Sequence, residues 1–331
     1  MNLPNSNDIS PFFLACEKGY LDIVKILLDC DRIDFNHRNS SELTSGFYIS
    51  CQLGHYEIVK FLLDDSRIDP NISQIDEATP FYIACQNNHV KIVQLLLESE
   101  QVDVNIPMVD HITPFYIACD KGHYEVVKLL VNNSRVDVNK AIIDQGSPFL
   151  IACAGGHLNI VQLLIQSKRV DIKNSTNQGI SPLFIACDKG HDDIVKLLLQ
   201  QPEVDINQES LDKRNSLWQA SQNGHLNVVK VLLAHDSPVN TKAKWNGNGN
   251  IPIEQARLMI KLGATLDWEG EDVASRQVNC LQIANLLEKY EENPEAIQFV
   301  LRKELGILSQ CSSDVFSLIV LLVDGYFTLR A

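Results

Sequence analysis

The sequence predicts an all-α solenoid of helix–turn–helix units. Three observations carry this prediction: a phrase that recurs seven times, a nearly constant period, and two helix patterns inside each period. The first interval is 35 residues and the next five are 34. Such a period is typical of repeat architectures, in which each unit packs on its neighbours rather than on a central core. The repeats are anchored at Pro11, Gly46, Pro80, Pro114, Pro148, Pro182 and Ser216.

Each repeat contains the signals of two helices. A Ser or Thr before the anchor can accept a hydrogen bond from the first free N–H groups of a helix, and a Pro at the anchor already has helical φ. Eight residues after the anchor a Gly is expected to end this helix in a left-handed conformation, and Asn88 is the exception. A second helix follows with one broad apolar face, as in Ile194, Val195 and Leu198. Neither helix buries its face alone, so stacking of the units is predicted.

The repeat phrase resembles the ankyrin repeat. The unit at 113–139 reads TPFYIACDKGHYEVVKLLVNNSRVDVN and recurs at 147–173 and 181–207. It matches T-P-L-H-x-A, a helix ending in Gly-His, a second helix rich in Val and Leu, and D-V-N. The resemblance implies β-hairpin fingers between repeats. The His of T-P-L-H is missing, and each repeat except the seventh has one extra residue before D-V-N. We interpret the residues that replace this His as core residues: Phe13, Tyr48, Tyr82, Tyr116, Leu150, Phe184 and Trp218.

The chain is expected to divide near residue 250. Residues 1–250 form the ankyrin-repeat array, with about seven repeats in 10–240 and then a linker rich in Gly and Asn. Residues 251–331 are expected to form a degenerate last repeat and a helical cap. Within them Asn293-Pro294 predicts a helix start and Gly306 its end, with a further apolar helix at 315–323. The alternative is that these last helices dock a partner.

Composition and charge narrow the function classes. Of the 331 residues, 45% are hydrophobic and 21% charged, as in folded proteins. A formal charge of −14 repels phosphate backbones, so no nucleic acid is expected as a partner. The first eight residues lack the pattern of a secretory signal, and the run at 315–323 is about half of the roughly 20 residues that cross a bilayer. We expect an intracellular, cytoplasmic protein without a membrane span, with the nucleus left open.

Two ladders of residues invite a reading as metal or catalytic sites. Zinc ligands converge on one point, whereas neighbours within each ladder lie a full repeat apart. We interpret the cysteines as small buried hydrophobes and the histidines as part of the Gly-His turn that the ankyrin resemblance implies. No carboxylate or nucleophile recurs beside them, so the sequence predicts no metal, no cofactor and no enzyme. The ladders are Cys16, Cys51, Cys85, Cys119, Cys153 and Cys187, and His55, His89, His123, His157, His191 and His225.

The function predicted is a non-catalytic protein–protein interaction scaffold or adaptor. It is expected to be a monomer that binds a partner protein through its hairpin fingers and concave helix face. One alternative is a regulatory or assembly factor that masks a site of its partner. Another, from a different class, is an enzyme whose activity lies in residues 251–331.

The candidate partner-binding residues are the finger tips and the ends of the first helices. Turn tips are normally polar, so apolar tips suggest a binding row, and the first-helix ends offer a polar rim. The other interpretation is that neighbouring fingers pack their tips on each other. The candidates are Ile75, Met108, Val109, Ile142, Ile143 and Leu211 at the tips, and Gln86, Asn87, Asp120, Lys121, Asp188 and Lys189 at the helix ends.

Overall fold

The computed structural model describes residues 9–30, 32–142, 146–262 and 273–307. The chain forms two compact units, Met1–Asn177 and Gln178–Ala331. This division falls inside the repeat array.

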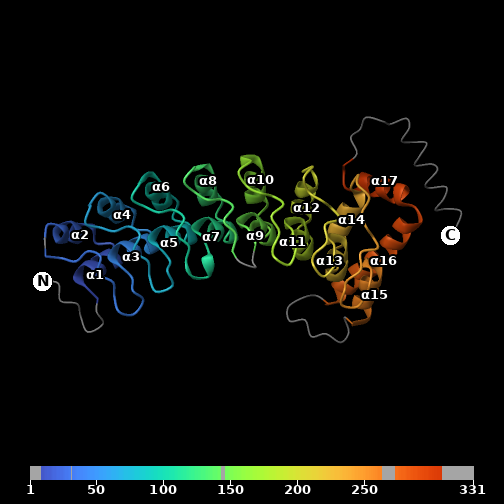
Figure 1. Cartoon of the computed structure of the whole chain (residues 1–331), viewed down its shortest axis with the longest axis horizontal. Helices are drawn as coiled ribbons and strands as arrows, with labels where there is room; N and C mark the ends of the chain where they lie inside the picture. The colour runs from blue at the N-terminus through green and yellow to red at the C-terminus, as the bar shows by residue number, and fades with distance from the viewer. Residues whose placement is uncertain (1–8, 31, 143–145, 263–272, 308–331) are drawn as a thin grey trace. The chain divides into compact units, whose positions relative to one another are not determined.

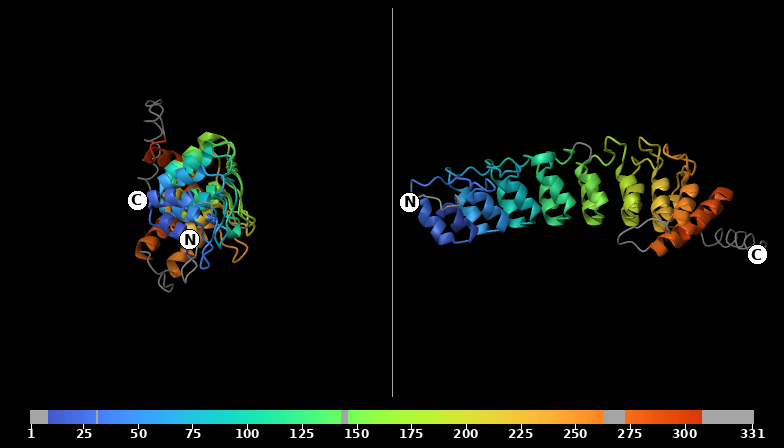
Figure 2. Two further views of the ribbon diagram at one scale, coloured as in Figure 1. Left: turned by 90° about the vertical axis from the view of Figure 1, so that its left-hand side faces the viewer. Right: turned by 90° about the horizontal axis from the view of Figure 1, so that it is seen from below.

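The first unit is a stack of five helix pairs (Figure 1). Its first helices α1, α3, α5, α7 and α9 contact one another in order, and α2, α4, α6, α8 and α10 form a second row beside them. Figure 2 shows the connecting loops along one side of these helices. The helices are α1 Pro11–Glu17, α2 Leu21–Leu28, α3 Gly46–Leu53, α4 Tyr56–Leu63, α5 Pro80–Gln86, α6 Val90–Glu98, α7 Pro114–Asp120, α8 Tyr124–Asn132, α9 Pro148–Ala154 and α10 Leu158–Ser167.

Helix starts and ends follow the predicted signals. The side chain of Thr113 accepts a hydrogen bond from the N–H of Tyr116 at 3.1 Å, and the other predicted capping residues make the same bond. The glycines after the first helices have positive φ, and Asn88 takes the same conformation with φ of 59°. Each repeat therefore sets its own two helices through local contacts.

The core lies between the two rows of helices. The six ladder cysteines have no exposed surface, and the residues that replace the expected His are all buried. The interpretation of both groups as core residues is confirmed. Ring contacts among the described residues join Phe12 to Phe35 and Trp218 to Trp245, so the aromatic residues at the His position fill the core without stacking on one another.

Side chains also bond each repeat to the backbone of its neighbour. The His123 ring bonds through Nε2 to the carbonyl of Gln86 at 2.9 Å, and His55, His89, His157 and His225 repeat this contact. Asn105 donates from Nδ2 to the carbonyl of Arg135 at 2.7 Å and accepts the N–H of Asp137 at 2.8 Å. The Gly-His turn is thus confirmed as structural, and these bonds fix the register of the stack.

The connections between repeats are tight turns and not paired strands. The N–H of Met108 donates to Ile112 at 2.9 Å, and Gln74 and Ala78 close the preceding finger at 3.0 Å. Positive φ at the tips, for example 62° at Glu77, bends the chain back at once. The described residues accordingly contain isolated β-bridges but no strand.

The second unit holds two regular helix pairs and a terminal helical group. α13 packs on α11 and α15, while α16 packs on α13, α14 and α15, and α17 on α14 and α16. Ile283, Ala284 and Leu287 of α16 are buried in this group. The helices are α11 Pro182–Lys189, α12 Asp192–Leu199, α13 Ser216–Asn223, α14 Leu226–Ala234, α15 Pro252–Leu262, α16 Val273–Glu292 and α17 Pro294–Glu304.

The segment expected to be a Gly/Asn linker is an ordered turn. The N–H of Asn246 donates to the carbonyl of Asp212 at 3.0 Å, and the Trp218 ring donates to the carbonyl of Asn250 at 2.9 Å. These bonds place residues 246–250 as one more finger ahead of α15. The predicted start at Asn293 and stop at Gly306 are confirmed, whereas the helix expected at 315–323 lies outside the described residues.

Candidate functional site

The finger tips are held by backbone hydrogen bonds between neighbouring fingers. The N–H of Ile75 donates to the carbonyl of Glu42, and the N–H of Val109 donates to that of Asp76, each at 2.9 Å. In the second unit the N–H of Leu211 makes the same bond to Gln178 at 2.9 Å. Neighbouring tips therefore meet through their backbones, which fixes the positions of the side chains that they carry.

The side chains at these tips point away from the protein. Ile75 is 58% exposed, Val109 42% and Leu211 66%. Met108, beside Val109, is partly exposed. Ile75 and Val109 lie on adjacent fingers of the first unit. Two exposed apolar side chains are therefore neighbours on turns that backbone hydrogen bonds hold together.

One expected tip residue is not at the surface. Ile142 is only 4% exposed, although its finger closes through the same backbone bond, to Gly146, that Met108 makes to Ile112. The expectation that Ile142 is an exposed tip residue is therefore wrong. Ile143 lies outside the described residues.

Only some of the candidate residues at the first-helix ends of the first unit are free to contact a partner. Asn87 is exposed but its side-chain amide donates to the carbonyl of Gln52 at 2.9 Å. Gln86 is partly buried and its carbonyl receives the His123 ring. Asp120 and the exposed Lys121 form an ion pair at 3.5 Å. This rim presents a charged pair beside neutral amides.

Asp188 of the second unit is tied into its own repeat stack. Its carboxylate accepts hydrogen bonds from Gln219 at 2.5 Å and Asn223 at 2.9 Å, and lies 3.2 Å from the ammonium group of Lys189. Lys189 is exposed. Of this pair, the lysine is the residue that offers free surface, whereas the aspartate organises α11 and α13.

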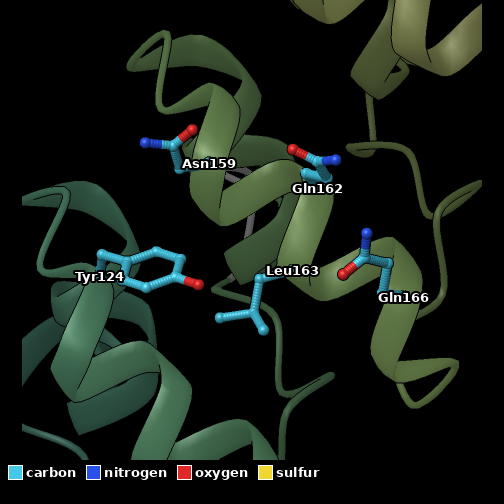
Figure 3. Close-up of a pocket in the computed structure, with 5 residues that line it drawn as sticks. All are labelled: Tyr124, Asn159, Gln162, Leu163 and Gln166. Atoms are coloured by element: carbon cyan, nitrogen blue, oxygen red, sulfur yellow. The ribbon is translucent and has the colours of Figure 1, made fainter.

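Sequence reasoning did not find a hollow of about 310 Å³ on the outer helices (Figure 3). It is lined by Tyr124 of α8 and by four residues of α10. All of its polar side chains are uncharged, and α10 carries no charged residue, unlike the other second helices of the repeats. The absence of charged residues from α10 is visible in the sequence and could have drawn attention to this surface. The α10 residues are Asn159, Gln162, Leu163 and Gln166.

Burial makes the thiol groups of the cysteine ladder unreactive. Burial raises the pKa of the Cys16 thiol to about 12, an effect that a hydrogen bond with Ser50 only partly offsets. Burial also raises the pKa of Cys119 and Cys153. Because the thiolate is the nucleophile and the metal ligand, these groups are inert at neutral pH. No three potential metal-binding side chains gather among the described residues, and none of the described helices has the length and apolar character to span a membrane.

Sequence comparison decides the family. The family described as "Ankyrin repeats (3 copies)" matches residues 1–74, 47–142 and 134–210, which is more than half of the chain. The chain belongs to the ankyrin-repeat family. Ankyrin repeats generally mediate protein–protein interaction, on a fold known for non-catalytic roles.

Structural comparison agrees on the ankyrin fold. The crystal structure of the human ASB11 ankyrin repeat domain is similar with a TM-score of 0.58 and 23% sequence identity, over 69% of this chain and 99% of that one. At this identity the similarity concerns the fold alone. No curated protein matches the sequence.

Proposed function

We propose that this ankyrin-repeat chain is a scaffold or adaptor that binds a partner protein through its finger tips and the adjoining first-helix ends. The observation that carries the proposal is the pair of exposed apolar tips, Ile75 and Val109, on neighbouring fingers joined by backbone bonds. Isolated exposed apolar residues are common on protein surfaces. Two of them on turn tips, where polar residues are usual, form the start of a recognition surface.

The geometry suits binding because the tips are already ordered. The backbone bonds at Ile75 and Val109 are made before any partner arrives, so a partner does not have to order these loops. Full burial of an Ile or Val side chain stabilises by about 1.5–3 kcal/mol, and roughly half of each side chain is exposed. Covering both would contribute about 2 kcal/mol. The pair Asp120–Lys121 and the amide of Asn87 supply polar contacts at the rim.

The test is a double substitution, Ile75→Ser with Val109→Ser. The partner is first identified by affinity purification from the native cell and mass spectrometry, then produced pure for titration. We expect about a tenfold or greater loss of affinity with the melting temperature changed by only a few degrees. Val300→Ser on α17 is the matched control, because Val300 is 40% exposed against 42% for Val109. Full affinity of the double variant, or an equal loss in the control, would refute binding through the tips.

A further inference from the structure

The first repeat keeps apolar residues at positions that other repeats use for stacking. Ile23 of α2 has the register of Ile58 in α4, yet Ile23 is 46% exposed and Ile58 only 2%. Leu14 of α1 has the register of Ile83 and Ile117, and is 46% exposed where they are 6% and 8%. Leu14 and Ile23 are therefore apolar like their counterparts in inner repeats, but unlike those counterparts they are exposed to solvent.

The exposure arises because no helix pair precedes α1 and α2 among the described residues. α1 packs on α3 and α2 on α4, each on one side only, and both lie at the end of the first unit (Figure 1). Pro11 is exposed there as well, whereas Pro80 and Pro114 are buried in inner repeats. The exposed outer face of a solenoid is normally polar. Among the described residues, this face of the first repeat is apolar at Pro11, Leu14 and Ile23.

An arginine adds a directional contact to this apolar face. Arg135 donates from Nη1 to the carbonyls of Leu97 and Ser99, at 3.1 and 2.8 Å, at the C-terminal end of the preceding α6. Arg169 contacts the end of α8 in the same way, and Arg67 reaches the last residue of α2, Leu28, at 2.9 Å. These carbonyls have no partner within their helix and carry the negative end of its dipole, so a guanidinium stabilises them.

Arg32 has the same register, but the part of the chain that the structure describes contains no helix pair before α1 for it to bind. It precedes Arg67 by 35 residues, which is the first repeat interval, and its side chain is exposed. An inner repeat contacts the repeat before it in two ways: apolar side chains pack on that repeat's helix pair, and a guanidinium binds the end of that repeat's second helix. With Arg32, the first repeat has the residues for both contacts.

We propose that the N-terminal face of the first repeat, formed by Pro11, Leu14, Ile23 and Arg32, binds the last helix pair of another ankyrin-type stack in a partner protein. The face continues the interface that the chain forms between its own repeats, which defines the occupant. A second copy joined head to tail is excluded as the occupant, because α15, α16 and α17 cover α13 and α14, the last regular pair. This surface is separate from the finger tips and extends the function proposed above.

The probe for this face is a designed ankyrin-repeat protein of three consensus repeats that lacks its C-terminal capping repeat. The same protein with its cap is the control probe. Titration calorimetry with the full chain should detect binding of the uncapped probe alone. Ile23→Ser should weaken it about tenfold or more and Arg32→Ala several-fold, since each removes one of the two contact types. Val300→Ser, which removes an apolar side chain of similar exposure on α17, should leave it unchanged. Equal binding of both probes, or no effect of Ile23→Ser, overturns the proposal.

A second measurement covers the case in which the uncapped probe aggregates. A copy of residues 78–111 encoded ahead of Ile9 places an inner repeat in native register before the full chain. We expect a higher melting temperature than the parent chain, and loss of most of the gain with Ile23→Ser. No gain overturns the proposal.

Other occupants give distinct outcomes. Sedimentation that shows a dimer abolished by Ile23→Ser would assign the face to a second copy. Probe binding that needs deletion of residues 2–8 would assign it to the start of the chain. Either result overturns the proposal, whereas failure of the finger-tip experiment leaves it standing.

Discussion

Replacing Arg135 by Ala should loosen the stack between the third and fourth repeats. The guanidinium makes two bonds through Nη1 and one through Nη2, to the carbonyl of Val102. A hydrogen bond to a charged group contributes about 1.5–3 kcal/mol when buried. This site is only part-buried, so water recovers a share of the lost bonding, and the two Nη1 bonds share one nitrogen. The expected loss is about 2–3 kcal/mol.

Thermal unfolding with hydrogen exchange measures this loss. At about 2–4 °C per kcal/mol for a unit of this size, the melting temperature should fall by roughly 4–12 °C. Exchange should quicken first at the end of α6. Arg32→Ala removes an exposed arginine of the same register, before which no helix pair is described, and should cost less than about 0.5 kcal/mol. Arg135→Lys should recover about a third of the loss, because an ammonium lacks the fork. Equal effects of Arg135→Ala and Arg32→Ala would show that the helix-end contact is not stabilising.

Three further predictions concern the core and the turns. Gly122→Ala should destabilise the protein by about 2–4 kcal/mol, because φ is 72° and an added Cβ would lie 2.6 Å from the His157 ring. Gly249→Ala, with φ of 73° and open space around it, should cost only about 1 kcal/mol. Urea unfolding compares the two variants, and equal costs would contradict the contact with His157. Tyr48→Phe should stabilise by about 1 kcal/mol in the same assay, because the buried Tyr48 hydroxyl has no hydrogen-bond partner; a loss would show that the hydroxyl is satisfied. Burial raises the pKa of Cys16 from 9.0 to about 12, so the unfolded state releases its proton first and the free energy of unfolding should fall as pH rises from about 9 towards 12. Thiol labelling at pH 9 with mass mapping should find Cys30 modified and Cys16 intact. Rapid labelling of Cys16 in the folded protein would contradict its burial.

The sequence predicted those features that a single repeat determines by itself. Thr113 caps its helix with its own side chain and Gly122 ends the helix with its own φ, so both can be read from a few neighbouring residues. Burial of the cysteine ladder follows equally from the apolar face of each helix pair. The recurrence of the same residue types seven times makes each of these local signals stronger.

What the sequence did not reveal depends on partners in other repeats or on the path of a turn. Arg135 reaches carbonyls up to 38 residues away, and the family phrase contains no arginine that would have drawn attention to it. Asn246 becomes a finger residue only through the carbonyl of Asp212. Ile142 is buried whereas Met108 at the equivalent position is partly exposed, a difference that an apolar pair in a loop does not disclose.

The asparagine ladder has a consequence for how such a chain can change its length. The next repeat offers the side chains of four asparagines a main-chain N–H and a main-chain carbonyl, which are present whatever side chains that repeat carries. These asparagines are Asn36, Asn71, Asn105 and Asn139. A duplicated segment of one full period brings its own asparagine and meets the same main-chain groups. Gain or loss of whole repeats by recombination therefore preserves every asparagine contact between neighbouring repeats. Selection can then alter the surface of one repeat without any compensating change in its neighbours.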